Sequence, residues 1–226
     1  MIETQNLTKI YQINSLMFVA LNNVNLTIED GEFAVIIGPS GAGKTTLLNL
    51  VGLIDKPTSG DVLLDGVKTA LLSEKERREI RLLKIGFIFQ TINLLPQLTA
   101  IENVEIPMAL MKLPSDKQRK RAIKLLESVG LGDKANRLPR QLSVGEMRRV
   151  AIARALANDP KIILADEPTG DLDLKTGMEI INLLHSIHEK SGRTVVVATH
   201  DKSIVKAADR VYFMRNGRIK LLRGRV

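Results

Sequence analysis

The chain has 226 residues, of which 44% are hydrophobic, 26% are charged and 3% are aromatic. These values are ordinary for a globular protein and exclude a disordered chain, and the absence of cysteine excludes disulfides and thiolate metal sites. The formal net charge of +8 leaves nucleic acid and anionic lipid open as partners. The first residues lack a secretory-signal pattern, and no apolar run approaches the ~20 residues that span a bilayer, so a cytosolic protein is expected.

The first part of the chain predicts short strands around a glycine-rich turn. A helix over residues 44–53 follows that turn, and residues 57–60 form a second turn. Apolar and alternating runs indicate strands at residues 2–7, 18–28, 33–37 and 61–64.

The rest of the chain predicts a helical insertion and then alternating strands and helices. Helices are expected over residues 73–83 and 115–129, each with a serine as N-cap, and Ser73 belongs to a capping box. Prolines 96, 107 and 114 interrupt the pattern after a strand at 86–90, so residues 91–145 are interpreted as a mainly helical insertion. The order that follows predicts a mostly parallel sheet: strand 161–165, helix 175–189, and strands 194–199 and 210–214.

Two basic stretches, residues 112–124 and 215–225, contribute much of the positive charge. One explanation is contact with nucleic acid or anionic lipid headgroups. The other, which we favour, is a solvated helix face for the first stretch and a frayed basic tail for the second.

The strongest motif is a phosphate-binding loop. It matches G-x-x-x-x-G-K-[ST] between an apolar strand and a helix, and consists of Gly38, Pro39, Ser40, Gly41, Ala42, Gly43, Lys44 and Thr45. Glycines let backbone amides turn onto phosphate oxygens, and the positive end of the following helix faces the same anion. We expect Lys44 to reach the β- and γ-phosphates, Thr45 to ligate Mg²⁺, and the binding loop to include Thr46.

Two acidic residues, Asp166 and Glu167, end an apolar run that begins at Ile162. Carboxylates at the C-terminal edge of a parallel sheet lie where nucleotide sites form. Asp166 is expected to hold Mg²⁺, and Glu167 to orient or deprotonate the attacking water. Adjacent acids are also found as solvated turn residues, but beside a phosphate-binding loop the catalytic interpretation is preferred.

The segment 142–156 narrows the choice among nucleotide hydrolases. It reads LSVGEMRRVAIARAL and resembles the ATP-binding-cassette (ABC) family, whose signature L-S-G-G-Q/E precedes a similar helix. The resemblance implies that two subunits pair head to tail, and that Ser143, Gly145 and Glu146 cap the ATP held by the partner. Ser143 and Glu146 also match a capping box, so on its own the segment is better explained as an N-capped helix with nothing bound; its order among the other motifs favours the signature interpretation.

The resemblance assigns roles to further positions. It implies that Gln90 contacts Mg²⁺ and the attacking water and senses a membrane partner, and that His200 hydrogen-bonds the γ-phosphate. Asp173 corresponds to the family's D-loop aspartate, and Tyr11 to the aromatic residue that stacks on adenine. Lys44, Gln90, Glu167 and His200 form the expected catalytic set, and Thr45, Gln90 and Asp166 the expected metal set.

Two residues depart from the family pattern. Val144 replaces the first signature glycine, and its β-branched side chain disfavours a positive φ, so an ordinary extended or helical backbone with retained hydrolysis is expected. Asp171 stands where relatives often carry Asn or Ala, and the sequence offers no explanation for its charge.

The resemblance covers nearly the whole chain and implies an α/β fold. The expected parts are a P-loop NTPase core with a mostly parallel sheet, an N-terminal antiparallel β subdomain and a helical insertion subdomain. Residues 1–226 would be a single nucleotide-binding domain, with the core at about 1–90 and 146–226 and the helical subdomain at about 91–145.

The implied function is ATP hydrolysis in a homodimer that closes over two ATP–Mg²⁺ and drives a separate membrane permease. Residues 85–90, 93–96, 98–104 and 165–170 are most similar to the lipoprotein-releasing and macrolide-exporting branch. We expect a cytoplasmic protein, peripheral on the inner face of the cell membrane, and no nucleic acid partner. The alternatives are a soluble ABC ATPase that acts on nucleic acid or ribosomes, and a regulatory cassette that binds ATP without hydrolysis.

Overall fold

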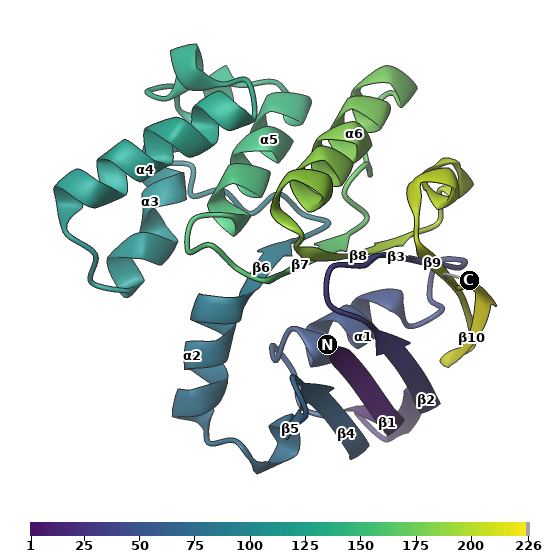
Figure 1. Ribbon diagram of the computed structural model, residues 1–226. Helices are drawn as coiled ribbons and strands as arrows, with labels where there is room; N and C mark the ends of the chain where they lie inside the picture. The colour runs from purple at the N-terminus through teal and green to yellow at the C-terminus, as the bar shows by residue number, and fades with distance from the viewer. Residues whose placement is uncertain (225–226) are drawn as a thin grey trace.

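The computed structural model describes residues 1–224 of the chain. Within them lie two β-sheets and the helices that cover them (Figure 1). The expected α/β class, with an antiparallel N-terminal sheet, a largely parallel second sheet and a helical insertion, is confirmed.

The smaller sheet is antiparallel and has the order β2-β1-β4-β5. Its strands are β1 (Ile2–Ile13), β2 (Leu16–Ile28), β4 (Ser59–Leu64) and β5 (Val67–Lys68). β1 continues beyond the predicted end at residue 7. Near that point Asn6 adopts a φ of 49° and the register with β2 shifts. This irregularity breaks the alternation of apolar residues from which the strand was predicted.

The larger sheet has the order β10-β9-β3-β8-β7-β6. Four strand pairs are parallel, and only β10 runs antiparallel to its neighbour. The strands are β3 (Phe33–Ile37), β6 (Ile85–Ile88), β7 (Ile162–Asp166), β8 (Thr194–Thr199), β9 (Arg210–Arg215) and β10 (Arg218–Arg223).

The expectation of a frayed basic tail is wrong for residues 218–223, which form β10. Asn216 and Gly217 have φ values of 50° and 70°, and they connect β9 to β10 in a tight hairpin. An Asn-Gly pair is a strong hairpin signal, but charged residues masked the strand pattern here. Arg225, the last base of that stretch, lies outside the described residues.

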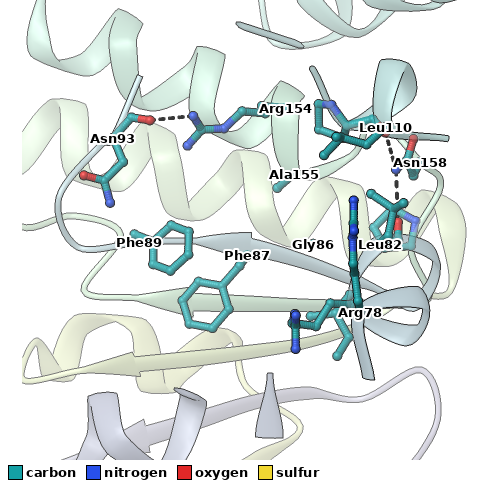
Figure 2. Close-up of a pocket in the computed structure, with 14 residues that line it drawn as sticks. Arg78, Leu82, Gly86, Phe87, Phe89, Asn93, Leu110, Arg154, Ala155 and Asn158 are labelled. Atoms are coloured by element: carbon teal, nitrogen blue, oxygen red, sulfur yellow. Dashed lines mark hydrogen bonds between the residues drawn. The ribbon is translucent and has the colours of Figure 1, made fainter. Parts of the chain in front are cut away.

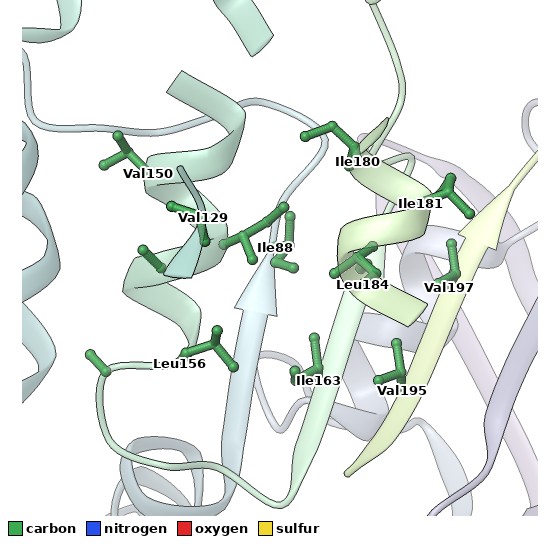
Figure 3. Packing of buried hydrophobic residues seen from close by; sticks show 14 of the residues in the cluster. Ile88, Val129, Val150, Leu156, Ile163, Ile180, Ile181, Leu184, Val195 and Val197 are labelled. Atoms are coloured by element: carbon green, nitrogen blue, oxygen red, sulfur yellow. The ribbon is translucent and has the colours of Figure 1, made fainter. Parts of the chain in front are cut away.

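Alternate residues of the parallel strands face two separate cores. One face packs against α5 (Val144–Ala155) and α6 (Leu174–Ser191), which lie above the sheet in Figure 1 and are shown close up in Figure 3. The other face packs against α1 (Lys44–Val51) and the antiparallel sheet. The strands β3, β7 and β8 are fully buried, which holds the loops at their C-terminal ends in place.

The expected insertion contains two α-helices and two short 3₁₀ helices: α3 (Ala100–Leu110), α4 (Ser115–Ser128), Gly132–Lys134 and Pro139–Gln141. A further helix, α2 (Glu74–Lys84), lies before β6 and outside the insertion. The Ser73 capping box is confirmed, whereas Ser115 is the first residue of its helix and makes no cap. Pro107 lies inside α3 rather than ending it, and the helix stops shortly afterwards. The basic residues of 112–124 lie on a mostly exposed face, in agreement with the solvated-face explanation.

Candidate nucleotide site

The phosphate-binding loop lies between β3 and α1, as predicted. A Cβ atom on Gly38 would lie 2.2 Å from the carbonyl oxygen of Met214, and one on Gly43 would lie 2.5 Å from that of Ala20. Gly43 also adopts a φ of 102°, so both positions require glycine. No side chain caps the start of α1, and its first turn carries no acid, so its amides are left for an anion.

Residues 40–46 of this loop and helix border a cavity of about 590 Å³. The cavity brings together the loop after β3, the segment after β6, the acid after β7 and the histidine after β8. Its lining consists of Phe18, Ala20, Ser40, Gly41, Ala42, Gly43, Lys44, Thr45, Thr46, Gln90, Glu167, Gly170, Asp171 and His200. All four expected catalytic residues, Lys44, Gln90, Glu167 and His200, are therefore in one place.

Glu167 is held by a network of buried donors. Its Oε2 accepts hydrogen bonds from the Thr199 hydroxyl at 3.0 Å and the His200 backbone amide at 3.3 Å, and lies 3.0 Å from His200 Nδ1. Burial raises the pKa of Glu167, but the bonds from His200 and Thr199 and the charge of Lys44 outweigh it and hold the pKa below its ordinary value. Glu167 is thus ionised and oriented at the cavity, as a general base requires.

Lys44 lies beside this network. Its ammonium donates to the carbonyl oxygens of Gly38 at 2.9 Å and Pro39 at 3.2 Å. These bonds curl the side chain along the loop, and its nitrogen remains on the wall of the cavity.

The residues expected at a metal ion also converge. Thr45 hydrogen-bonds the buried Asp166 carboxylate, whose Oδ1 has no hydrogen-bond partner within the described chain. Burial and the neighbouring charge of Glu167 raise the pKa of Asp166, against the opposing effects of Thr45 and Lys44. A buried carboxylate oxygen without a partner fits a hydrated cation. Among residues 1–224 there is no group of three or more His, Cys, Asp or Glu that could hold a metal ion.

Tyr11 does not line the cavity. Its hydroxyl donates to Asp55 Oδ2 at 2.8 Å, and the Lys9 ammonium lies 4.8 Å from the ring centre. Phe18, which faces Tyr11 across the β1–β2 hairpin, is the aromatic residue on the cavity wall, and sequence analysis missed it. A strand of exposed apolar residues gave no sign of which one would point at the site.

The signature residues lie apart from the cavity. Ser143, Gly145 and Glu146 border a different hollow, and the Ser143–Glu146 capping box is present. A Cβ on Gly145 would lie 2.6 Å from the Thr176 side chain. The backbone amide of Thr176 donates to the Asp173 carboxylate, which is the N-cap of α6. Val144 is the first residue of α5 and has no positive φ, which confirms the expected ordinary backbone.

Two other residues near the site were not predicted to have a role there. Thr199 was seen only as the end of a strand, although its hydroxyl binds Glu167. Arg148 is buried under the segment that carries Gln90, which sequence spacing alone could not reveal.

Comparison with known proteins identifies the family of the chain. The profile described as "ABC transporter" matches residues 21–170. An uncharacterized ABC transporter ATP-binding protein of Methanocaldococcus jannaschii is 52% identical over 219 residues, which are 97% of each chain. The macrolide export ATP-binding/permease protein MacB of Bartonella quintana is 43% identical over 215 residues, 95% of this chain and 32% of that protein.

Solved structures are similar over the whole fold. A dimeric, post-hydrolysis ATP-binding cassette bound to ADP and Pi superimposes with a TM-score of 0.91 at 47% identity, covering 99% of this chain and 100% of that one. A cassette from Clostridium perfringens described as part of the cbiONQ transporter complex has a TM-score of 0.84 at 33% identity, covering 97% of this chain and 86% of that one.

Proposed function

The chain belongs to the ABC transporter family as an ATP-binding and ATP-hydrolysing subunit, and we propose that two copies close over two ATP molecules to drive a separate membrane permease. The observation that carries the proposal is the Glu167 network, in which an ionised carboxylate, His200 and Lys44 meet at one cavity. Because phosphoryl transfer depends mostly on positioning and electrostatics, this set provides the proton acceptor and two of the groups that position the phosphates.

The roles follow from where the groups lie. Lys44 and the uncapped amides at the start of α1 bind the β- and γ-phosphates. Glu167 accepts the proton of the attacking water, and His200, at the same sheet edge after the neighbouring strand β8, hydrogen-bonds the γ-phosphate. The residues 38–46 hold the substrate so that these groups face its terminal phosphate.

Thr45, Gln90 and Asp166 would hold Mg²⁺, a fit supported by the unpartnered Oδ1 of Asp166. When bound, the ion would neutralise charge that develops on the transferred phosphoryl group. The Thr45–Asp166 hydrogen bond orients both side chains before any cation binds.

The homodimer accounts for the residues that stand outside the cavity. Ser143, Gly145, Glu146 and Asp173 lie away from the Lys44 cavity, so they serve a nucleotide only if a second chain presents them. The dimeric state of the superimposable cassette supports this arrangement. Tyr11, which hydrogen-bonds the cavity residue Thr46, is proposed to contact the adenine.

The permease is proposed to dock in a groove of about 380 Å³ beside Gln90 (Figure 2). Phe87, Phe89 and Leu110 line it with apolar surface, and Arg78 and Arg81 add positive charge. Since Gln90 follows Phe89 directly, a permease segment that displaces Phe89 would also move the backbone of Gln90. We propose that the permease is of the lipoprotein-releasing or macrolide-exporting type.

We further propose that residues 1–226 form one nucleotide-binding domain, with a core at about 1–90 and 146–226 and a helical subdomain at about 91–145. No helix among residues 1–224 is long and apolar enough to cross a membrane. A cytoplasmic position, peripheral on the inner face of the membrane, follows from docking to a permease.

The test uses Glu167→Gln, which keeps the shape of the side chain but cannot accept a proton. We expect turnover to fall about 10²-fold or more, with an ATP-bound dimer accumulating on size-exclusion chromatography. Glu105→Gln, which removes a half-buried carboxylate paired with Arg119 away from the cavity, is the matched control and should behave as wild type. A monomeric Glu167→Gln variant with near wild-type turnover would overturn the proposal.

A further inference from the structure

The segment that carries Gln90 has no secondary structure of its own. Residues 89–93 lie between β6 and α3 and belong to neither a helix nor a strand. Gln90 must nevertheless reach the nucleotide cavity, which it lines. Some other element must therefore fix this stretch of backbone.

Arg148 supplies the first half of that support. One terminal nitrogen of its guanidinium donates to the carbonyl oxygen of Phe89 at 2.6 Å, and the other donates to that of Gln90 at 2.9 Å. The residue is 1% exposed. Burying a charged guanidinium is unfavourable unless its donors are used, so the fork is committed to these two carbonyls.

Arg154, further along the same helix, supplies the second half. Its guanidinium donates to the carbonyl oxygen of Asn93 at 2.6 Å and to that of Ile92 at 3.1 Å; the bond to Asn93 is drawn in Figure 2. Two forks on α5 therefore hold four of the five carbonyls of residues 89–93.

Asp171, in the loop between β7 and α6, also lies near Arg148. The two residues border one hollow, and the negative charge of Asp171 acts on the Arg148 guanidinium. Asp171 and Gln90 also share the wall of the nucleotide cavity. The unexplained acid at position 171 thus faces the buried base that holds Gln90.

We propose that Arg148 is a positioning residue for Gln90: its fork fixes the backbone of residues 89–90, and so sets the reach of the Gln90 side chain into the nucleotide cavity. Because α5 begins at the signature residues, the fork also ties Gln90 to the helix that meets the partner's nucleotide. The inference rests on the proposed function, since it assigns Gln90 a place in the ATP site.

The first experiment follows the backbone without nucleotide or metal. In Arg148→Met, the exchange rate of the amides in residues 89–93 should rise at least about tenfold over wild type, because a local opening no longer breaks two charge-assisted bonds. Arg121→Met is the matched control: Arg121 donates to the Ala157 carbonyl at 2.6 Å but does not contact this segment. Equal exchange in the two variants would overturn the inference.

The second experiment measures ATP hydrolysis against Mg²⁺ concentration, together with ATP affinity without metal. Arg148→Met should lower kcat and raise the half-saturating Mg²⁺ concentration, each by about tenfold, as for the loss of a residue that supports a ligand. Metal-free ATP affinity should stay within about twofold, because it depends on the phosphate-binding loop. Arg148→Lys, which keeps the charge but cannot form a fork, should give an intermediate result.

A double-mutant cycle separates positioning from general destabilisation. If Arg148 acts through Gln90, then Arg148→Met should change turnover less than about twofold in a Gln90→Ala background. Fully multiplicative losses would show that Arg148 only stabilises the fold. Wild-type protein without ATPase activity would instead reject the proposed function itself, which keeps the two failures distinct.

Discussion

The ammonium nitrogen of Lys44 lies 3.3 Å from Oε1 of Glu167, and both side chains are largely buried. The cation that we propose to bind phosphate and the carboxylate that we propose to act on the attacking water are therefore paired directly with each other. A triphosphate bearing several negative charges competes for Lys44, and its binding would release Glu167 from this pair. Phosphate binding by Lys44 would therefore leave the Glu167 carboxylate without its ion pair to Lys44 and available to the attacking water.

Lys44→Ala should abolish productive ATP binding, because no other ammonium lines the cavity among the described residues. Isothermal titration should show at least about a 10²-fold loss of affinity, as expected when a buried cation on the phosphates is removed. Lys84→Ala, which removes an exposed lysine paired with Asp65, is the control. Unchanged ATP affinity and turnover in Lys44→Ala would show that the loop is not the phosphate site.

Most of the nucleotide site could be predicted because its residues follow directly after buried strands. Lys44, Glu167 and His200 come after apolar runs, and parallel strands bring such ends to one edge. Phe18 and Arg148 could not be predicted in this way. Phe18 is placed by the register of the β1–β2 hairpin, which the sequence pattern does not define, and Arg148 by the packing of α5 over the end of β6, a contact between segments distant in sequence.

The same reasoning explains the errors in the fold. β10 lies at the sheet edge and combines three basic with three apolar residues, of which only Ile219 is half-buried, so its composition resembled a solvated tail. Pro107 suggested a break, but α3 is buried against α4 and α5 and carries a capping box at Thr99. Packing and capping there outweigh the loss of one helical hydrogen bond.

The aromatic residue that contacts adenine can be identified by comparing three substitutions. Tyr11→Phe should bind ATP within about twofold of wild type, because it keeps the ring, and the hydroxyl that it removes donates to Asp55. Tyr11→Ala should weaken binding about tenfold, in line with about 1–3 kcal/mol for stacking of a base on an aromatic ring. A larger loss in Phe18→Ala than in Tyr11→Ala would transfer the role to Phe18.

Asp55 should make stability depend on pH in acid. Burial raises its pKa, but hydrogen bonds from Lys9 and Tyr11 dominate and hold the pKa below the ordinary value of 3.8. A depressed pKa means that the carboxylate stabilises the fold at pH values above 3.8, and that this contribution disappears as pH falls through the lower folded-state pKa. Urea unfolding of wild type and Asp55→Asn should therefore differ at pH 7 and converge below the ordinary value. A difference that stays constant down to acid pH would rule out this linkage.

The last prediction concerns Val144, the first residue of α5, whose side chain is 43% exposed on the surface that we assign to the partner's nucleotide. Val144→Gly removes its methyl groups and adds backbone freedom, which costs about 0.5–1 kcal/mol of fold stability at a helical position. In the proposed homodimer, where each site is shared between two chains, both sites would change together. Affinity for ATP in dilute monomer should not change, because that binding uses residues 38–46 of the same chain. The ATPase rate at high protein concentration should rise or stay level, as any conflict between the valine and the opposing nucleotide is removed.

Val144→Ala separates the two effects, since it trims the methyls but keeps a residue that favours the helix. If either substitution weakened ATP binding in the dilute monomer, the signature would be acting on its own chain's nucleotide, and the shared two-chain site would have to be abandoned.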